Sequence, residues 1–248
     1  MVIKKLAVYL VLSLIFVLPA FGWNYQTHEV IAESAYYFIA EETQSKLNLT
    51  LLRLGAITPD KYFHDYINHH YPISFYKAVY WLEMTTDYYN QGNYNKASYA
   101  FGIASHYISD SFSAPHYIKN EASKLHLEYE NQALEPSTST RIRFACDKPA
   151  AIDLNQSLYY ASREAGTWQR WVETKDPGIP QNAISKATAL VNQIALETFD
   201  TSCSKNETVV IKEPIISFGK VALLGLILLL IFLVLIAKPK RLSKLSKD

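Results

Sequence analysis

The sequence predicts an all-α protein, in which one multi-helix domain is followed by a single membrane-spanning helix near the carboxyl terminus. Apolar residues recur at helical spacing in several segments, and no run with the period-2 alternation of a strand stands out. A separate uninterrupted apolar run lies at positions 221–237. Residues 23–204 leave roughly 180 residues, enough for one domain with a full hydrophobic core. The formal net charge of +1 says little about partners.

Five segments of the domain show helical periodicity. In the first of them, Val30, Ile31, Ala35 and Phe38 recur at the spacing of one helix face. Prolines and glycines mark the connections, and Pro115 lies shortly after the end of the third segment. Helices whose potential metal-binding side chains, described below, face inward would form a bundle-like domain. The predicted helices span residues 23–42, 74–90, 94–112, 156–172 and 182–199.

Residues 1–22 have the pattern of a secretory signal peptide. Two lysines precede an apolar stretch, and Ala20 and Gly22 place small residues at the two positions that the signal peptidase reads. The alternative is an uncleaved anchor helix, although the apolar stretch is short for a membrane span. Cleavage after Gly22 would make Trp23 the mature amino terminus.

The apolar run at 221–237 is the predicted membrane span. It has seventeen residues, of which fourteen are Leu, Ile, Val or Phe. At 1.5 Å per residue it crosses about 25 Å, and it can be extended toward residue 215 if Lys220 reaches the interface. A buried core helix is the alternative. The basic residues that follow should stay in the cytoplasm, so the domain faces outward. We expect a single-pass cell-membrane protein with a domain at 23–204, a linker at 205–214, a spanning helix at 215–237 and a cytoplasmic tail at 238–248.

Cys146 and Cys203 are the only cysteines. In an exported domain they are expected to form one disulfide, which would close a long loop and constrain the unfolded chain. Neither cysteine has the spacing of a zinc knuckle. Two free buried thiols are the alternative.

A short stretch of the chain carries five potential metal ligands in the pattern H-x3-D-x5-H-x9-H-x3-E. Its members are His106, Asp110, His116, His126 and Glu130. A spacing of four places His106 with Asp110, and His126 with Glu130, on one helix face each. Imidazole and carboxylate together are typical ligands of catalytic zinc sites. All seven histidines lie between positions 28 and 126, which predicts a centre with more than one metal ion.

Each of these features alone has an ordinary explanation. An H-x3-D or H-x3-E pair is usually a surface pair on a helix. His116 could cap its loop, and His28 could be a partly exposed histidine without a special role. At least one member of the dipeptide His69-His70 is not a ligand. The combination favours the metal centre, because five such features would otherwise have to coincide by accident.

The pattern resembles the zinc-dependent phospholipase C family, which is related to the single-strand-specific fungal nucleases. The resemblance begins with Trp23 after the signal peptide and His28 in the first helix, and continues with Asp60 before a histidine–aromatic turn. It ends with the H-x3-D-x5-H core and the pair His126 and Glu130 that follows. The resemblance thus reaches to about residue 132. The short spacing from Trp23 to His28 is similar to the nucleases, whereas the final Glu130 is similar to the lipases. The loops at 60–69 and 116–126 are shorter than in either group.

The resemblance implies a cluster of three zinc ions inside an all-α domain. Trp23, through its free α-amino group and carbonyl oxygen, and His28 would bind one ion, and Asp110 would bridge this ion to the next. Because an amine binds zinc only in its free neutral form, signal cleavage would itself activate the protein. The second ion would be bound by Asp60, His69 and His106, and the third by His116, His126 and Glu130.

Three zinc ions and three carboxylates would leave an excess of positive charge. Such a centre suits an anionic phosphodiester and its five-coordinate transition state. A zinc-bound water would have its pKa lowered toward about 7. Asp60 is the candidate to orient or deprotonate the water, alongside or instead of acting as a ligand. Tyr62, Tyr66 and Tyr71 could line a pocket for the phospholipid head group, although packing is the simpler role for them.

The sequence leaves three functions open. The first is a membrane-tethered, outward-facing phospholipase C that releases a phosphorylated head group, with the tether raising the effective concentration of phospholipid. The second is hydrolysis of single-stranded nucleic acid or nucleotide esters, but the domain has no strongly basic stripe, which argues against a nucleic-acid partner. The third is a non-catalytic, zinc-stabilised ectodomain. No protein partner is inferred.

Overall fold

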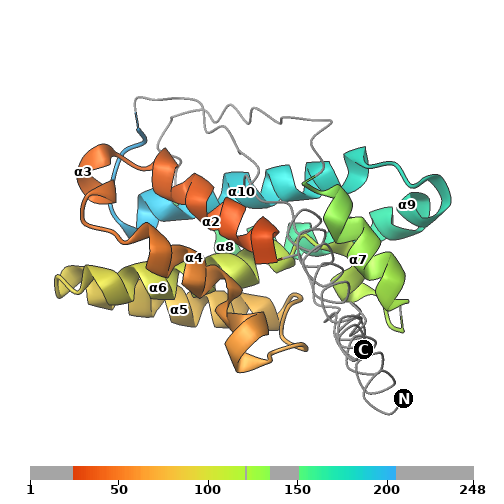
Figure 1. The fold of residues 1–248 in the computed structure, drawn as a ribbon, viewed down its shortest axis with the longest axis horizontal. Coiled ribbons are helices and arrows are strands. Elements are labelled where there is room, and N and C mark those ends of the chain that lie inside the picture. Colours follow the sequence, from red (N-terminus) through yellow and green to blue (C-terminus); the bar gives the residue numbers. More distant parts are fainter. Residues whose placement is uncertain (1–24, 121, 135–150, 205–248) are drawn as a thin grey trace, which may run out of the picture. The chain divides into compact units, whose positions relative to one another are not determined.

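Helices account for the regular structure of residues 25–120, 122–134 and 151–204, the part of the chain that the computed structural model describes. No strand occurs within these ranges, and one isolated β-bridge joins Ile39 to Cys203. The predicted all-α fold is therefore confirmed. In chain order the elements (Figure 1) are α2 (Tyr25–Phe38), α3 (Glu41–Gln44), α4 (Leu49–Thr58), η1 (Pro59–Phe63), α5 (Ile73–Asn90), α6 (Tyr94–Asp110), η2 (Ala114–Tyr117), α7 (Ser123–Gln132), α8 (Leu154–Ala161), η3 (Ser162–Thr167), α9 (Trp168–Thr174) and α10 (Gly178–Thr198).

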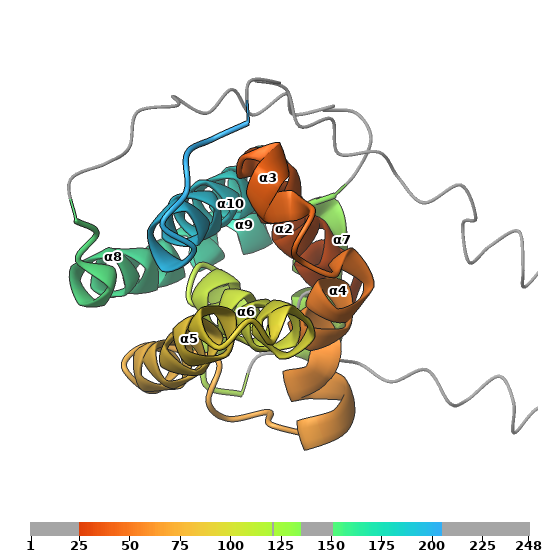
Figure 2. The same ribbon diagram turned by 90° about the vertical axis from the view of Figure 1, so that its left-hand side faces the viewer.

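Helix α6 is the central element of the domain. It packs against α5, α4 and α10, and every residue from Ala100 to Asp110 is buried. A helix buried on all sides belongs to the interior of a domain. Figure 2 shows α6 between α5 and α4, with α2 and α10 above these three helices in this view. The turn from α5 to α6 contains Gly92 with a φ of 73°, a conformation that glycine adopts without steric cost.

Two glycines let α4 and α6 touch through their backbones. A Cβ atom at Gly55 would lie 2.1 Å from the carbonyl oxygen of Tyr99, and one at Gly102 would lie 2.1 Å from the carbonyl oxygen of Leu52. Any side chain larger than hydrogen would therefore separate the helices. The close crossing brings α4, and the turn that follows it, against the part of α6 that carries His106.

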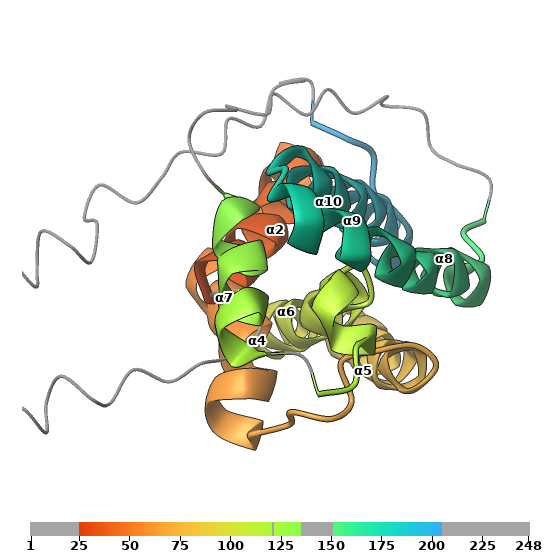
Figure 3. The ribbon, with the colours of Figure 1, turned by 90° about the vertical axis from the view of Figure 1, so that its right-hand side faces the viewer.

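The segment after residue 150 supports α7, whose predicted ligands lie near its carboxyl end. The ring of Tyr129 lies 5.8 Å from that of Trp168 and 5.1 Å from that of Trp171. The Trp171 Nε1 group also donates a hydrogen bond of 2.9 Å to Gln132 Oε1. Figure 3 looks onto this end of the domain, where α7 and α9 lie. The later helices thus hold α7 in place, a role that the sequence did not reveal.

One predicted helix is shorter in the structure, and another is divided. The first ends at Phe38 instead of residue 42, because Ile39 leaves the helix to form the bridge with Cys203. The predicted helix at 156–172 is divided into α8, the 3₁₀-helical segment η3 and α9. η3 contains Gly166, and glycine weakens a helix interior. These corrections arise from tertiary pairing and from a local helix breaker, respectively.

The last helix begins earlier than predicted, and two helices were not predicted. α10 begins at Gly178 rather than residue 182, because Pro180 is tolerated in a first turn, where N–H groups lack helical partners. The unpredicted helices are α3 and α4, whereas α7 was expected from the one-turn spacing of His126 and Glu130 without bounds for the helix. α4 begins at an Asn48 cap, whose side chain accepts a hydrogen bond of 3.1 Å from the Leu51 amide.

Several predicted features lie outside the described residues. These are the signal peptide at 1–22, Trp23, the linker, the spanning helix at 215–237 and the tail. Among the helices that the structure describes, none has the length and apolar character that a membrane span needs. Cys203 is disulfide-bonded rather than free. Its predicted partner Cys146 lies outside the described residues, so the pairing stays a prediction.

Candidate metal centre

Eight of the nine predicted ligands come together inside the domain, and the ninth, Trp23, lies outside the described residues. Their ligand atoms form four overlapping groups of three, each with its atoms within 4.8 Å of one another. The side chains come from six segments that are far apart in the sequence. They are His28 from α2, Asp60 from η1, His69 from the loop before α5, His106 and Asp110 from α6, His116 from η2, and His126 and Glu130 from α7.

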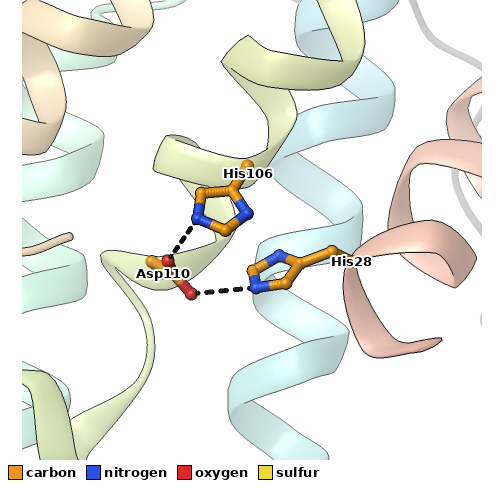
Figure 4. Close-up of side chains that lie close together, drawn as sticks. All are labelled: His28, His106 and Asp110. Carbon is orange, nitrogen blue, oxygen red and sulfur yellow. Dashed lines mark ion pairs between the residues drawn. The ribbon is translucent and has the colours of Figure 1, made fainter. Parts of the chain in front are cut away.

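Asp110 lies at the middle of the cluster. Its Oδ1 atom is 3.3 Å from His28 Nε2, and its Oδ2 atom is 3.1 Å from His106 Nε2 (Figure 4). Oδ2 also lies 2.6 Å from His69 Nδ1, and Oδ1 lies 4.0 Å from His116 Nδ1. The side chain is fully buried. A carboxylate that faces imidazoles through both oxygens is positioned to bridge two ions.

Hydrogen bonds orient His28 and His106 so that Nε2 of each ring faces the cluster. Ser109 Oγ donates to the His106 carbonyl oxygen at 2.9 Å, and His28 Nδ1 lies 3.0 Å from the same Oγ. His28 Nδ1 is therefore the donor in this contact. His106 Nδ1 donates to the Ala56 carbonyl oxygen at 2.8 Å, across the glycine-mediated crossing of α4 and α6. A hydrogen bond donated by Nδ1 fixes the tautomer in which Nε2 presents its lone pair to a metal.

Asp65 holds the loop that carries His69. Its backbone amide donates to the Pro59 carbonyl oxygen at 3.0 Å, and its own carbonyl oxygen accepts from His69 Nε2. The hydroxyl of Tyr107 donates to Asp65 Oδ2 at 2.8 Å and ties the loop to α6. With Nε2 used in this way, Nδ1 of His69 is the nitrogen that faces Asp110.

The third ligand group combines η2 with α7. The Oε1 atom of Glu130 lies 2.9 Å from His126 Nε2 and 3.4 Å from His116 Nε2. Ser113 Oγ donates to the same Oε1 atom at 3.1 Å. The side chain of His126 is 18% exposed, more than any other described ligand of the cluster. The cluster is therefore nearest to solvent at its α7 side.

The buried polar atoms of the cluster identify it as a fitting metal site. Buried polar atoms normally have hydrogen-bond partners, and each exception requires an explanation. Within the described residues, seven buried side-chain nitrogen or oxygen atoms of the predicted ligands lack such a partner. Ligation of metal ions would satisfy these atoms. The seven are His28 Nε2, Asp60 Oδ2, His106 Nε2, both Oδ atoms of Asp110, His116 Nδ1 and Glu130 Oε2.

The electrostatics of the cluster follow from burial and from the mixture of charges. Burial lowers the pKa of His28 well below its usual value, and His106 adds to this effect. Burial alone would raise the pKa of Asp110, but the four surrounding imidazoles hold it well below its usual value. Burial raises the pKa of Asp60. A neutral His28 and an ionised Asp110 are the protonation states that bind metals.

The structure also separates ligands from other predicted residues. His69, not His70, is the member of the dipeptide that enters the cluster. Tyr62 and Tyr66, predicted to line a head-group pocket, are 54% and 51% exposed. The Tyr71 hydroxyl donates to Asn155 Oδ1 on α8 at 3.1 Å, so this hydroxyl is engaged outside the cluster.

The sequence did not reveal the residues that orient the ligands. These are Ser109, Ser113, Asp65, Tyr107 and the backbone carbonyl of Ala56. Ser109 and Tyr107 belong to the segment whose resemblance to the family was noted, but their hydrogen bonds reach partners more than forty positions away, at His28 and Asp65. The only sequence signal was their place beside His106 and Asp110.

An all-α domain with overlapping groups of buried imidazoles and carboxylates defines a class of protein that can hold several metal ions close together. The chain matches the sequence model described as zinc dependent phospholipase C over residues 27–179, and it belongs to this family. All eight described ligands lie within the matched residues. No curated protein matches the sequence.

One solved structure similar to this chain is the alpha toxin from Clostridium absonum. The two chains share 16% sequence identity with a TM-score of 0.48. The similarity covers 72% of this chain and 64% of the toxin chain, so this protein spans less than two thirds of the toxin's length.

Proposed function

We propose that the protein is a membrane-tethered, outward-facing phospholipase C with three zinc ions. It would cleave phospholipids between glycerol and phosphate and release the phosphorylated head group. Family membership supports the reaction type. The observation that carries the proposal is the convergence of eight ligands, six of which have buried nitrogen or oxygen atoms without a hydrogen-bond partner. The signal peptide and spanning helix predicted from the sequence support the tether and its orientation.

The ligand groups support a three-ion assignment close to the one implied by the family. His28 and Asp110 would hold the first ion together with Trp23. His106 lies both in the group of His28 and Asp110 and in the group of Asp60 and His69, so it could bind either the first or the second ion. Asp60, His69 and His106 would hold the second ion, with Asp110 as the bridge. His116, His126 and Glu130 would hold the third ion.

Bound zinc ions supply Lewis acidity, which lowers the pKa of a water ligand and stabilises negative charge on the phosphate and the leaving oxygen. The chain supplies orientation and proton transfer. Asp60 Oδ2 is buried without a hydrogen-bond partner, and burial raises the pKa of this carboxyl group. A buried carboxylate oxygen without a donor is available to accept a proton from water, so Asp60 is our candidate general base. Asp110 and Ser109 keep the imidazoles in fixed orientations.

The test is head-group release by the purified, zinc-loaded full chain in detergent. We expect release from phosphatidylcholine that disappears on chelation and in His106→Ala, together with loss of bound zinc in this variant. His64→Ala is the matched control, because His64 is exposed, belongs to none of the ligand groups and has its Nδ1 atom 3.0 Å from the neighbouring Tyr66 hydroxyl. Release from single-stranded DNA but not from any phospholipid would indicate the nuclease activity instead. Stoichiometric zinc without turnover on either substrate would indicate a non-catalytic ectodomain.

A further inference from the structure

Exposed apolar side chains gather on one part of the described surface. Among the described residues, eleven large hydrophobic side chains are exposed, and seven of them lie between positions 62 and 80. Ile67 is 75% exposed and Tyr76 is 67% exposed. The seven side chains belong to η1, the loop after it and the first half of α5. The aromatic surface is defined here by Tyr62, Phe63, Tyr66, Ile67, Tyr76 and Tyr80.

Two contacts join the η1 segment to α5. The ring of Phe63 stacks on that of Trp81 with centroids 6.1 Å apart. Lys77 Nζ lies 3.6 Å from Asp65 Oδ2. Positions 76, 77, 80 and 81 are neighbours on one face of a helix. The exposed tyrosines of α5 therefore lie beside the exposed residues of η1 and its loop.

The aromatic surface borders the metal centre. Residues 61–68 connect two of the ligands, Asp60 and His69, so the exposed side chains of this short segment lie between two buried ligands. Asp65 is the only carboxylate between positions 61 and 80, and it is engaged by Tyr107 and Lys77. Lys61 Nζ lies 5.4 Å from the centre of the Tyr62 ring. The surface thus combines aromatic rings, hydroxyl groups and lysines, without another carboxylate on this segment.

We propose that the aromatic surface docks onto the head-group and upper acyl region of a phospholipid bilayer. Tyrosine has an apolar ring and a polar tip, and it is enriched at membrane–water interfaces. Lysine is attracted to anionic lipid surfaces. Only ten residues separate the described domain from the predicted spanning segment at 215–237, at most about 35 Å of extended chain, so the domain stays close to lipid. The inference rests on the proposed function, because docking would bring phospholipid close to the metal centre.

The test uses the zinc-loaded full chain with two substrates. One is dihexanoyl phosphatidylcholine below its micellar concentration, and the other is long-chain phosphatidylcholine in vesicles. The variant is Tyr76→Ser/Tyr80→Ser, and the matched control is Tyr37→Ser/Tyr160→Ser, because Tyr37 and Tyr160 are exposed tyrosines outside the aromatic surface. We expect the variant to hydrolyse vesicle lipid about tenfold more slowly, with an unchanged rate on the monomeric lipid.

A second readout does not depend on hydrolysis. Vesicles of brominated phosphatidylcholine should quench the fluorescence of the half-buried Trp81, and the quenching should be lost in Trp81→Phe and reduced in Tyr76→Ser/Tyr80→Ser. Equal vesicle rates and equal quenching in the variant and the control would overturn the docking surface. Self-association that is lost in the variant, without quenching by lipid, would also overturn it and would assign the surface to a second copy of the chain. Quenching without hydrolysis of either lipid would support the surface and overturn the proposed function.

Discussion

The substitution Gly102→Ala tests whether the crossing of α4 and α6 builds the metal centre. The new Cβ atom would lie 2.1 Å from the Leu52 carbonyl oxygen, 2.8 Å from the Ala56 amide and 2.9 Å from the Gly55 Cα, all of which are backbone atoms. Ordinary contact begins at 3.4 Å, so the helices would have to separate locally by about 1.3 Å. No side-chain rotation can relieve this overlap.

The separation would act directly on a ligand one helical turn away. His106 Nδ1 donates to the Ala56 carbonyl oxygen at 2.8 Å, and the same displacement would lengthen this bond to about 4 Å, beyond hydrogen-bond distance. Overpacking costs about 1–3 kcal/mol and the lost hydrogen bond about 1 kcal/mol. For a domain of this size we expect the melting temperature to fall by roughly 5–15 °C. The bound zinc should fall as well, because His106 loses its orientation.

The assay is a thermal melt of the purified full chain with measurement of zinc per chain. Gly166→Ala is the matched control, because no atom beyond its chain neighbours and its own helix backbone lies within 4 Å of the Cβ position there. The control should keep its zinc and gain up to about 1 kcal/mol from the reduced entropy of the unfolded chain. A Gly102→Ala protein with the melting temperature and zinc content of the control would refute the role of the helix crossing.

Two further changes probe His69 and its support. Tyr107→Phe removes the hydroxyl that donates to Asp65, so zinc affinity in a chelator competition should fall about 10–100-fold, and unchanged affinity would contradict this role. In the zinc-free protein, burial alone would lower the pKa of His69, but Asp110 raises it from 6.5 to about 9. The resulting stability, about 3 kcal/mol, is complete below pH 6.5 and lost as the pH rises through 9. Urea unfolding of wild type and His69→Gln should show a difference that shrinks over this range; a constant difference would argue against the linkage.

The metal ligands could be predicted from the sequence because much of their geometry is local. His106 with Asp110, and His126 with Glu130, are spaced by one helical turn, and the structure places each pair on one helix. The periodicity of α6 was equally clear, so its bounds differ from the prediction by only two residues at the carboxyl end.

Features that depend on distant contacts could not be predicted. The choice between His69 and His70 is made by a loop that Asp65 anchors to Tyr107, 42 positions away. The end of α2 at Phe38 also depends on a distant contact, because Ile39 leaves the helix to form its bridge with Cys203. A sequence pattern indicates which faces are apolar, but not which loop residue turns inward.

The most direct test of the account is X-ray diffraction from crystals of the zinc-loaded protein at the zinc absorption edge. Three anomalous peaks are expected inside the domain, each at about 2.0–2.2 Å from nitrogen or oxygen atoms of its assigned ligands. One of them should lie against the amino group of Trp23. The absence of peaks among these eight side chains, or zinc bound only elsewhere on the chain, would contradict this expectation.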